Sequence, residues 1–150
     1  PQEDRYIMGK KAAENDIAIL MGGRSADEII FDQQTTGARN DIEKATTLER
    51  KMVCEWGMSD NLGPLTYGKK EEAIFLGKEF NKRQDYSEST AVSIDEEVKK
   101  IVLENYKRAK SMLQINKDVL TILAQTLLEK EVLDGNEIEL LVRDKIKSVE

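Results

Sequence analysis

The chain has 150 residues, of which 39% are hydrophobic and 35% charged, and its formal net charge is −6. A chain of this length can bury one hydrophobic core, so we expect a single domain with a polar surface. The negative charge argues against a nucleic-acid partner, whose phosphates are bound mainly by lysine and arginine. It argues equally against attraction to an anionic membrane surface.

Two residue counts narrow the chemistry further. The sequence contains one cysteine, Cys54, and no histidine. A lone cysteine forms no disulfide within the chain, which favours a reducing compartment and excludes a thiolate-rich zinc site. The missing histidine excludes a histidine-dependent triad and a histidine-ligated metal within these residues. An enzyme containing this chain therefore uses no histidine or takes part of its site from elsewhere.

Neither a signal peptide nor a membrane-spanning helix is expected in this sequence. The first residues, PQEDRYIMGKK, are polar and lack the apolar core of a signal peptide. No apolar run approaches the roughly 20 residues that a membrane-spanning helix needs.

The first helical pattern runs over residues 8–21, where apolar residues recur at helical spacing. Gly22 and Gly23 follow, and they leave two alternatives open. They end the helix, with Ser25 and Glu28 forming a capping box for a second one. Otherwise they stay helical and let a neighbouring element approach closely, at a cost of about 1 kcal/mol per glycine.

A second helix is predicted over residues 41–56, after the turn-rich residues 32–40. Gly57 stands where a left-handed C-cap residue is expected. One face of this helix carries Ile42, Ala45, Met52 and Trp56. We expect Trp56 to pack, with Tyr67, at the junction between the helix and the loop that follows.

Residues 57–87 read as an irregular segment, because Pro64 interrupts regular hydrogen bonding and polar residues dominate. Within it, Phe75 and Leu76 form an apolar island that we expect to contact the body of the domain. Cys54, just before this segment, is expected to be a small buried residue rather than a reactive thiol.

The second half predicts three helices. Ser87 fits the N-cap of a long helix that reaches about residue 114, and Asn116 and Asp134 fit the starts of two more. Short connections between the three indicate an antiparallel bundle. The predicted fold class is therefore all-α, with a C-terminal antiparallel helix bundle and an irregular loop segment around 57–87.

Asp41 lies in the stretch TTGARNDIEKAT, residues 35–46. Asn40 and Glu43 fit a capping box, and the helix macrodipole favours an aspartate in the first turn by about 0.3–1 kcal/mol. Asp41 can thus be explained as a residue that only starts the helix. A carboxylate held in this position also suits a metal ligand, although catalytic zinc needs three protein ligands and a water. The residues alone leave both readings open.

Several blocks in collinear order resemble the peptidase domain of the FtsH family, the membrane-anchored, ATP-dependent zinc metalloproteases. The resemblance covers nearly the whole chain and is more specific than any single motif. The matching blocks are ILMGGRSADEIIF (19–31), TTGARNDIEKAT (35–46), MVCEWGMSDNLGPLTYG (52–68), IFLG (74–77), IDEEVKKIVLENYKRAKSML (94–113) and LLEKEVLDGNEI (127–138).

The resemblance implies a zinc site to which this chain contributes one ligand. In the family, zinc is bound by an aspartate and by two histidines of an H-E-x-x-H helix, whose glutamate is the general base. The aspartate lies in the motif matched by TTGARND, which places the metal ligand at Asp41. Since H-E-x-x-H does not occur here, no catalytic residue is expected in this chain, which we predict to be inactive alone.

The resemblance also implies features of the full-length protein. These are ATP bound by a separate ATPase domain, a homo-hexameric ring, and substrates that are unfolded or membrane proteins. Attachment to a bacterial inner membrane or an organelle membrane would come from segments outside these residues, with this domain in a reducing soluble compartment. Residues 1–68 would form part of the zinc-site region, and residues 87–150 the helical bundle.

Two alternatives to a protease remain. The chain could be a non-catalytic helical interaction or assembly module that keeps the fold of the FtsH peptidase domain. A plain helical bundle unrelated to proteolysis would require the collinear matches to be accidental.

The acidic residues Asp27 and Glu28 match acidic positions of the family. They either support the zinc site or serve as a salt bridge or helix-start pair, and the second role is favoured. Arg24, one turn earlier, is the expected partner of one of them.

Overall fold

The computed structural model describes residues 7–68, 84–143 and 145–147. These residues form five α-helices and one short 3-10 helix, and none of them is in a strand. The elements are α1 (Lys10–Phe31), η1 (Thr36–Ala38), α2 (Arg39–Cys54), α3 (Glu88–Ile115), α4 (Lys117–Lys130) and α5 (Gly135–Val142). The predicted all-α class is confirmed.

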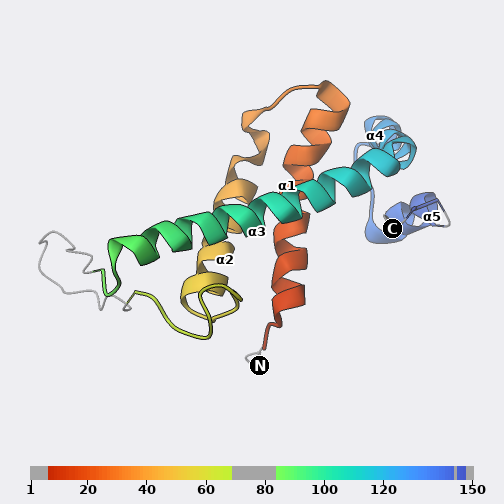
Figure 1. Cartoon of the computed structure of the whole chain (residues 1–150). Coiled ribbons are helices and arrows are strands. Elements are labelled where there is room, and N and C mark those ends of the chain that lie inside the picture. Colours follow the sequence, from red (N-terminus) through yellow and green to blue (C-terminus); the bar gives the residue numbers. More distant parts are fainter. Residues whose placement is uncertain (1–6, 69–83, 144, 148–150) are drawn as a thin grey trace, which may run out of the picture.

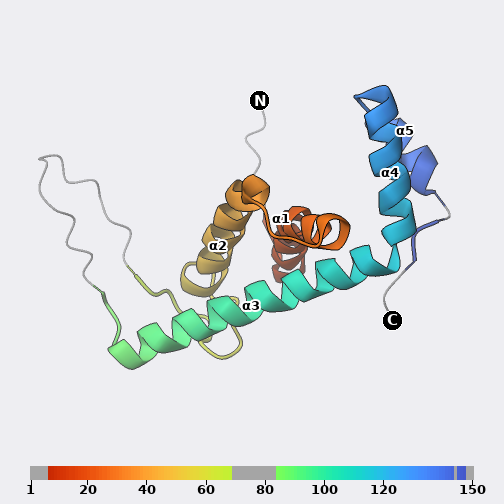
Figure 2. The same ribbon diagram turned by 90° about the horizontal axis from the view of Figure 1, so that it is seen from above.

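Helices α1 and α2 form an antiparallel pair, and α3 crosses both of them (Figures 1 and 2). The core lies where the three helices meet. One cluster of buried side chains joins α1 to α2, and a second joins the end of α2 to the first half of α3. The members are Ala13, Ile17, Met21, Ala45 and Met52 in the first cluster, and Val53, Ile94, Val98 and Ile101 in the second.

Helix α1 continues through Gly22 and Gly23, so the second of the two alternatives holds and the predicted capping box of Ser25 and Glu28 is wrong. Ser25 is buried inside the helix, and its hydroxyl donates to the Met21 carbonyl at 3.0 Å. Burial of one α1 face against α2 and α3 offsets the helical cost of the two glycines.

Three predicted helix ends agree with the structure. The Ser87 hydroxyl accepts from the Thr90 amide at 3.2 Å, and the Asp134 carboxylate accepts from the Glu137 amide at 2.8 Å. Gly57 adopts the expected left-handed conformation, with φ of 59°.

Asn116 differs from the prediction, because it makes no side-chain cap on α4. Its side-chain amide instead donates to the carbonyls of Met112 and Lys147, both at 2.9 Å. The residue thus ties the corner between α3 and α4 to the C-terminal residues that follow α5.

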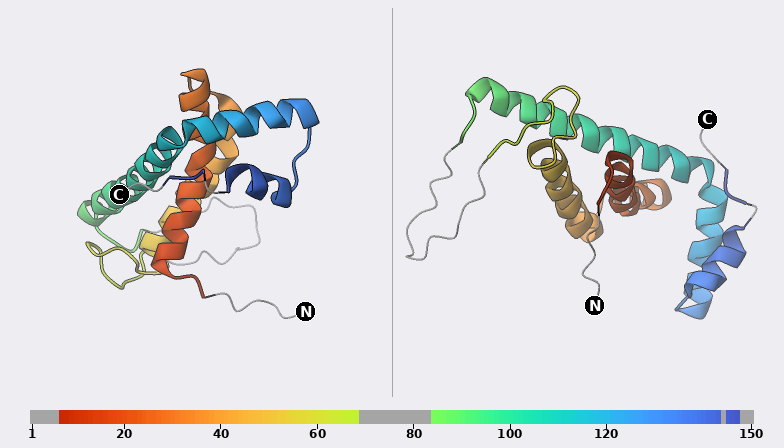
Figure 3. Two further views of the ribbon diagram at one scale, coloured as in Figure 1. Left: turned by 90° about the vertical axis from the view of Figure 1, so that its right-hand side faces the viewer. Right: turned by 90° about the horizontal axis from the view of Figure 1, so that it is seen from below.

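The arrangement of the last three helices also differs from the expected bundle. Helix α3 packs mainly against α1 and α2. Helix α4 points away from the C-terminal end of α3, and α5 lies beside α4 (Figure 3). A single residue, Asn116, separates α3 from α4. That connection is shorter than the two to five residues with which helical hairpins usually reverse the chain.

The described residues of the predicted irregular segment, 57–68 and 84–87, lie in no helix or strand. Phe75 and Leu76 lie outside the described residues. Among the helices of the described part, none is long and apolar enough to cross a membrane.

Candidate metal-ligand site

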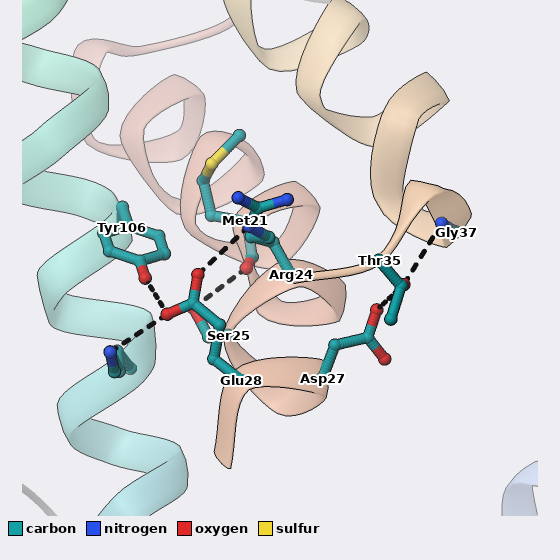
Figure 4. Close-up of polar contacts among 9 residues, drawn as sticks. Met21, Arg24, Ser25, Asp27, Glu28, Thr35, Gly37 and Tyr106 are labelled. Carbon is teal, nitrogen blue, oxygen red and sulfur yellow. Dashed lines mark hydrogen bonds and ion pairs between the residues drawn. The ribbon is translucent and has the colours of Figure 1, made fainter. Parts of the chain in front are cut away.

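The turn that precedes α2 is held by a carboxylate of α1. Asp27 accepts a hydrogen bond from the Thr35 hydroxyl at 2.7 Å, and the same hydroxyl oxygen accepts from the Gly37 amide at 3.2 Å (Figure 4). Both bonds end on the segment that leads into η1 and then α2. The last turn of α1 therefore fixes the direction in which α2 begins.

Asp41 lies in the first turn of α2, as expected, and is half-buried. The predicted capping box is wrong, because α2 begins earlier, at Arg39, and Asn40 is already helical. Glu43 forms an ion pair with Arg39 at 3.2 Å. Asp41 therefore takes no part in a capping box, although its place in the first turn still lets it interact favourably with the helix dipole.

The Asp41 carboxylate lies against α1 at Gly23. A Cβ atom placed on Gly23 would be 3.4 Å from Asp41 Oδ2, whereas a Cβ on Gly22 would meet no atom within 4 Å. Hydrogen bonds and ion pairs in this region engage Asp27, Thr35, Gly37 and the Arg39–Glu43 pair. Within the described residues, none of them engages the Asp41 carboxylate.

A carboxylate without a protein partner at a helix start fits one position in the coordination shell of zinc. The described part of the chain holds no group of three or more His, Cys, Asp or Glu residues that could bind a metal ion. Asp41 therefore fits as a single ligand, and a complete metal site would need ligands from other residues.

Glu28 joins α1 to α3, through a network that Figure 4 shows beside the Asp27 turn. It accepts from the Tyr106 hydroxyl, from Lys110 at 3.0 Å and from Arg24 at 3.0 Å. The Tyr106 hydrogen bond, followed by that of Lys110, lowers the pKa of Glu28 to about 2. The predicted pair of Arg24 with a neighbouring acid is confirmed, and Glu28 serves the helix packing.

The junction after α2 is filled by Tyr67 but not by Trp56. The Tyr67 hydroxyl donates to the Leu62 carbonyl at 2.6 Å, and its ring meets that of Tyr86 edge-on. Trp56 is 40% exposed, so it does not pack inside the junction as predicted. It lies past the end of α2, where the left-handed Gly57 turns the backbone, and it lines a surface groove of about 420 Å³ that reaches Asn40.

Cys54 is half-buried beside the second core cluster, as expected of a structural residue. Burial raises the pKa of its thiol, which disfavours the reactive thiolate.

Sequence reasoning missed three residues of this region. Thr35 gave no signal, because its role depends on an α1 carboxylate eight positions away. Tyr106 is spaced with Val98 and Val102 at helical intervals, so nothing in the sequence marks it as a hydrogen-bond donor to α1. Glu49 occupies a helical position of the apolar face of α2, but its charge concealed that it is fully buried.

The amino-acid sequence matches a known protein family. Residues 1–141 match the model of peptidase family M41. The chain belongs to that family. Its M41 relatives include proteins named ATP-dependent zinc metalloprotease FtsH from several bacteria.

The FtsH of Magnetococcus marinus is 55% identical over 138 residues, covering 92% of this chain and 20% of that protein. The FtsH of Pseudothermotoga lettingae is 51% identical over 146 residues, which is 97% of this chain and 23% of the relative. The FtsH of Thermotoga maritima is 44% identical over 149 residues, or 99% of this chain and 24% of the relative. The chain thus spans about a quarter or less of these relatives, and the predicted resemblance to the FtsH family is confirmed.

Proposed function

We propose that this chain is the C-terminal part of the peptidase domain of an ATP-dependent zinc metalloendopeptidase, in which Asp41 is one of the zinc ligands. The observation that carries the proposal is the half-buried Asp41 carboxylate, which lies beside Gly23 without a protein partner among the described residues. Membership of family M41 and the names of the relatives support it.

The other two ligands and the general base would come from an H-E-x-x-H helix outside these residues. Bound zinc would supply an activated water for peptide hydrolysis, because it lowers the pKa of that water to about 7. The part of this chain is to present Asp41 from the first turn of α2. Without the remaining ligands, the 150-residue chain is expected to be inactive and to retain no zinc at low micromolar concentration.

The full-length protein would act as a homo-hexamer on unfolded or membrane proteins, with ATP bound by a separate domain and with a membrane anchor outside this chain. Residues 1–68 would belong to the zinc-site region of a single domain. The names of the relatives, ATP-dependent zinc metalloproteases, support zinc and ATP dependence.

Zinc binding by the full-length protein tests the assignment. Asp41→Asn removes the charge of the ligand with little change in size, so the affinity for zinc in a chelator competition should fall. Asp118 offers a matched control, because it is the acidic residue in the first turn of α4. Asp118→Asn loses the same interaction with a helix dipole and should bind zinc like the wild type.

Equal zinc affinity of the wild type and Asp41→Asn would reject Asp41 as a ligand. A full-length protein that binds no zinc at all would favour the alternative, a non-catalytic assembly module of the same fold.

A further inference from the structure

We infer that Gly23, Asp27 and Thr35 position Asp41, so that α1 supplies the support on which the proposed metal ligand is held. The inference rests on the proposed role of Asp41 and extends it to three residues that are not proposed as ligands. Gly23 leaves the space in which the carboxylate lies, and the Asp27–Thr35 hydrogen bond fixes the turn that delivers α2.

The first part of the support is the missing side chain of Gly23. A Cβ at this position would already touch Asp41 Oδ2, at 3.4 Å, which is an ordinary contact distance. Any larger side chain would extend into the volume beside the carboxylate and displace it. A glycine inside α1 lowers the stability of the helix, but at this position it leaves room for the Asp41 carboxylate.

The second part lies one helical turn further along α1. Gly23 and Asp27 are four residues apart, so they share one face of the helix. Asp27 holds Thr35, and Thr35 holds the Gly37 amide, so that two hydrogen bonds join α1 to the residues leading into α2. These two hydrogen bonds, and not only the conformation of the turn, therefore set the position of the start of α2 relative to Gly23.

The third part is the anchoring of α1 itself. Glu28, next to Asp27, is held by Tyr106 and Lys110 of α3 and by Arg24 of its own helix. The two neighbouring acidic residues thus make different contacts. Glu28 attaches the end of α1 to α3, and Asp27 attaches the turn before α2 to α1. Groups that hydrogen-bond a metal ligand typically contribute 10- to 100-fold to metal affinity, and we expect the support from α1 to act in the same range.

The adjacent glycines provide a matched pair for the test in the full-length protein. Gly23→Val places two γ-carbons, confined to essentially one rotamer in a helix, beside Asp41. Gly22→Val makes the same chemical change where a Cβ meets no atom within 4 Å. In a titration with zinc against a chelator, Gly23→Val should lose about 10- to 100-fold in affinity, and Gly22→Val should match the wild type.

Thermal unfolding of the two variants separates positioning from a general loss of structure. Valine is a slightly better helix former than glycine, so neither change should lower the stability of α1 through propensity. A loss of zinc affinity confined to Gly23→Val, with similar unfolding temperatures, supports the inference. Equal zinc affinities of Gly22→Val and Gly23→Val would overturn the role of Gly23.

The turn is tested by a change that keeps size and removes the hydroxyl. Thr35→Val should lower the zinc affinity. Thr35→Ser keeps the hydroxyl that donates to Asp27, so its zinc affinity should match that of the wild type. If Thr35→Ser were as damaging as Thr35→Val, the hydrogen bond would not be the cause and this part would be wrong. Asp41→Ala in the same titration separates the ligand role of Asp41 from its positioning. Unchanged zinc affinity of Asp41→Ala would reject Asp41 as a ligand. If Asp41→Ala loses affinity, the results for the Gly23 and Thr35 variants decide the inference.

Discussion

Glu49 shows at the scale of a single residue how this chain departs from a simple hydrophobic core. Its side chain is fully buried, and neither carboxyl oxygen has a hydrogen-bond partner among the described residues. Burial, with smaller contributions from Glu14 of α1 and Glu97 of α3 and an opposing one from Lys10, raises the pKa of Glu49 to about 8. The carboxyl group is therefore neutral in the folded chain at pH 7, which removes most of the cost of burying it.

The raised pKa predicts that the chain loses stability as the pH rises. The folded state binds the Glu49 proton more tightly than the unfolded state, whose pKa is near 4.5, so the stabilising effect is complete below that pH and is lost as the pH rises to about 8. The free energy of unfolding should fall by up to about 1.4 kcal/mol per pH unit in this window.

Urea unfolding of the wild type and Glu49→Gln between pH 5 and pH 8 measures the effect. The stability of Glu49→Gln should depend less on pH than that of the wild type. Parallel pH profiles would contradict the assignment. Glu28 does not interfere, because its pKa of about 2 places its own stability loss below pH 4.5.

At the scale of elements, the end of α2 depends on close backbone approach. Gly57 has φ of 59°, and a Cβ there would lie 2.7 Å from Pro64 Cα. The Met58 amide bonds back to the Met52 carbonyl at 2.9 Å, so the turn is part of the helix end. The position requires glycine for its conformation and also for its lack of volume.

Gly57→Ala should therefore destabilise the chain more than Gly63→Ala. Gly63 also has a left-handed φ, of 74°, but a Cβ there would meet no atom within 4 Å. Gly63→Ala should cost only the left-handed strain of about 1–2 kcal/mol, and Gly57→Ala should cost about 1–3 kcal/mol more because of overpacking. Equal losses in denaturant unfolding would show that Pro64 moves aside.

The helices α4 and α5 should be the least stable part of this chain. Val119 is the one buried residue of α4, and α5 has none. Isolated helices of these lengths are marginal in water. In hydrogen exchange on the 150-residue chain, amides of α4 and α5 should exchange faster than those of α1 to α3, and equal protection would contradict this division.

At the scale of the whole molecule, the sequence predicts what depends on local chemistry. The all-α class, the caps at Ser87 and Asp134 and the left-handed Gly57 follow from residues within a few positions of one another. Which helices pack against one another does not follow from neighbouring residues. The predicted antiparallel bundle would place α3 beside α4 and α5, whereas α3 packs mainly on α1 and α2.

The candidate site divides in the same manner. Its central residue, Asp41, could be named from a motif, because the motif is continuous in sequence. Its support could not, since Gly23, Asp27 and Thr35 meet only when α1 and α2 pair. The burial of Glu49 could not be predicted either. Its helical position predicts a buried residue, whereas its charge predicts an exposed one.

The most direct measurement of the central claim is ATP-dependent hydrolysis of an unfolded protein by the full-length protein and its Asp41→Asn variant, with ATPase activity followed in parallel. The account predicts that the variant loses hydrolysis by more than the 10- to 100-fold typical of groups that only orient a ligand, and that it keeps its ATPase activity. Hydrolysis at the wild-type level by Asp41→Asn would contradict the account.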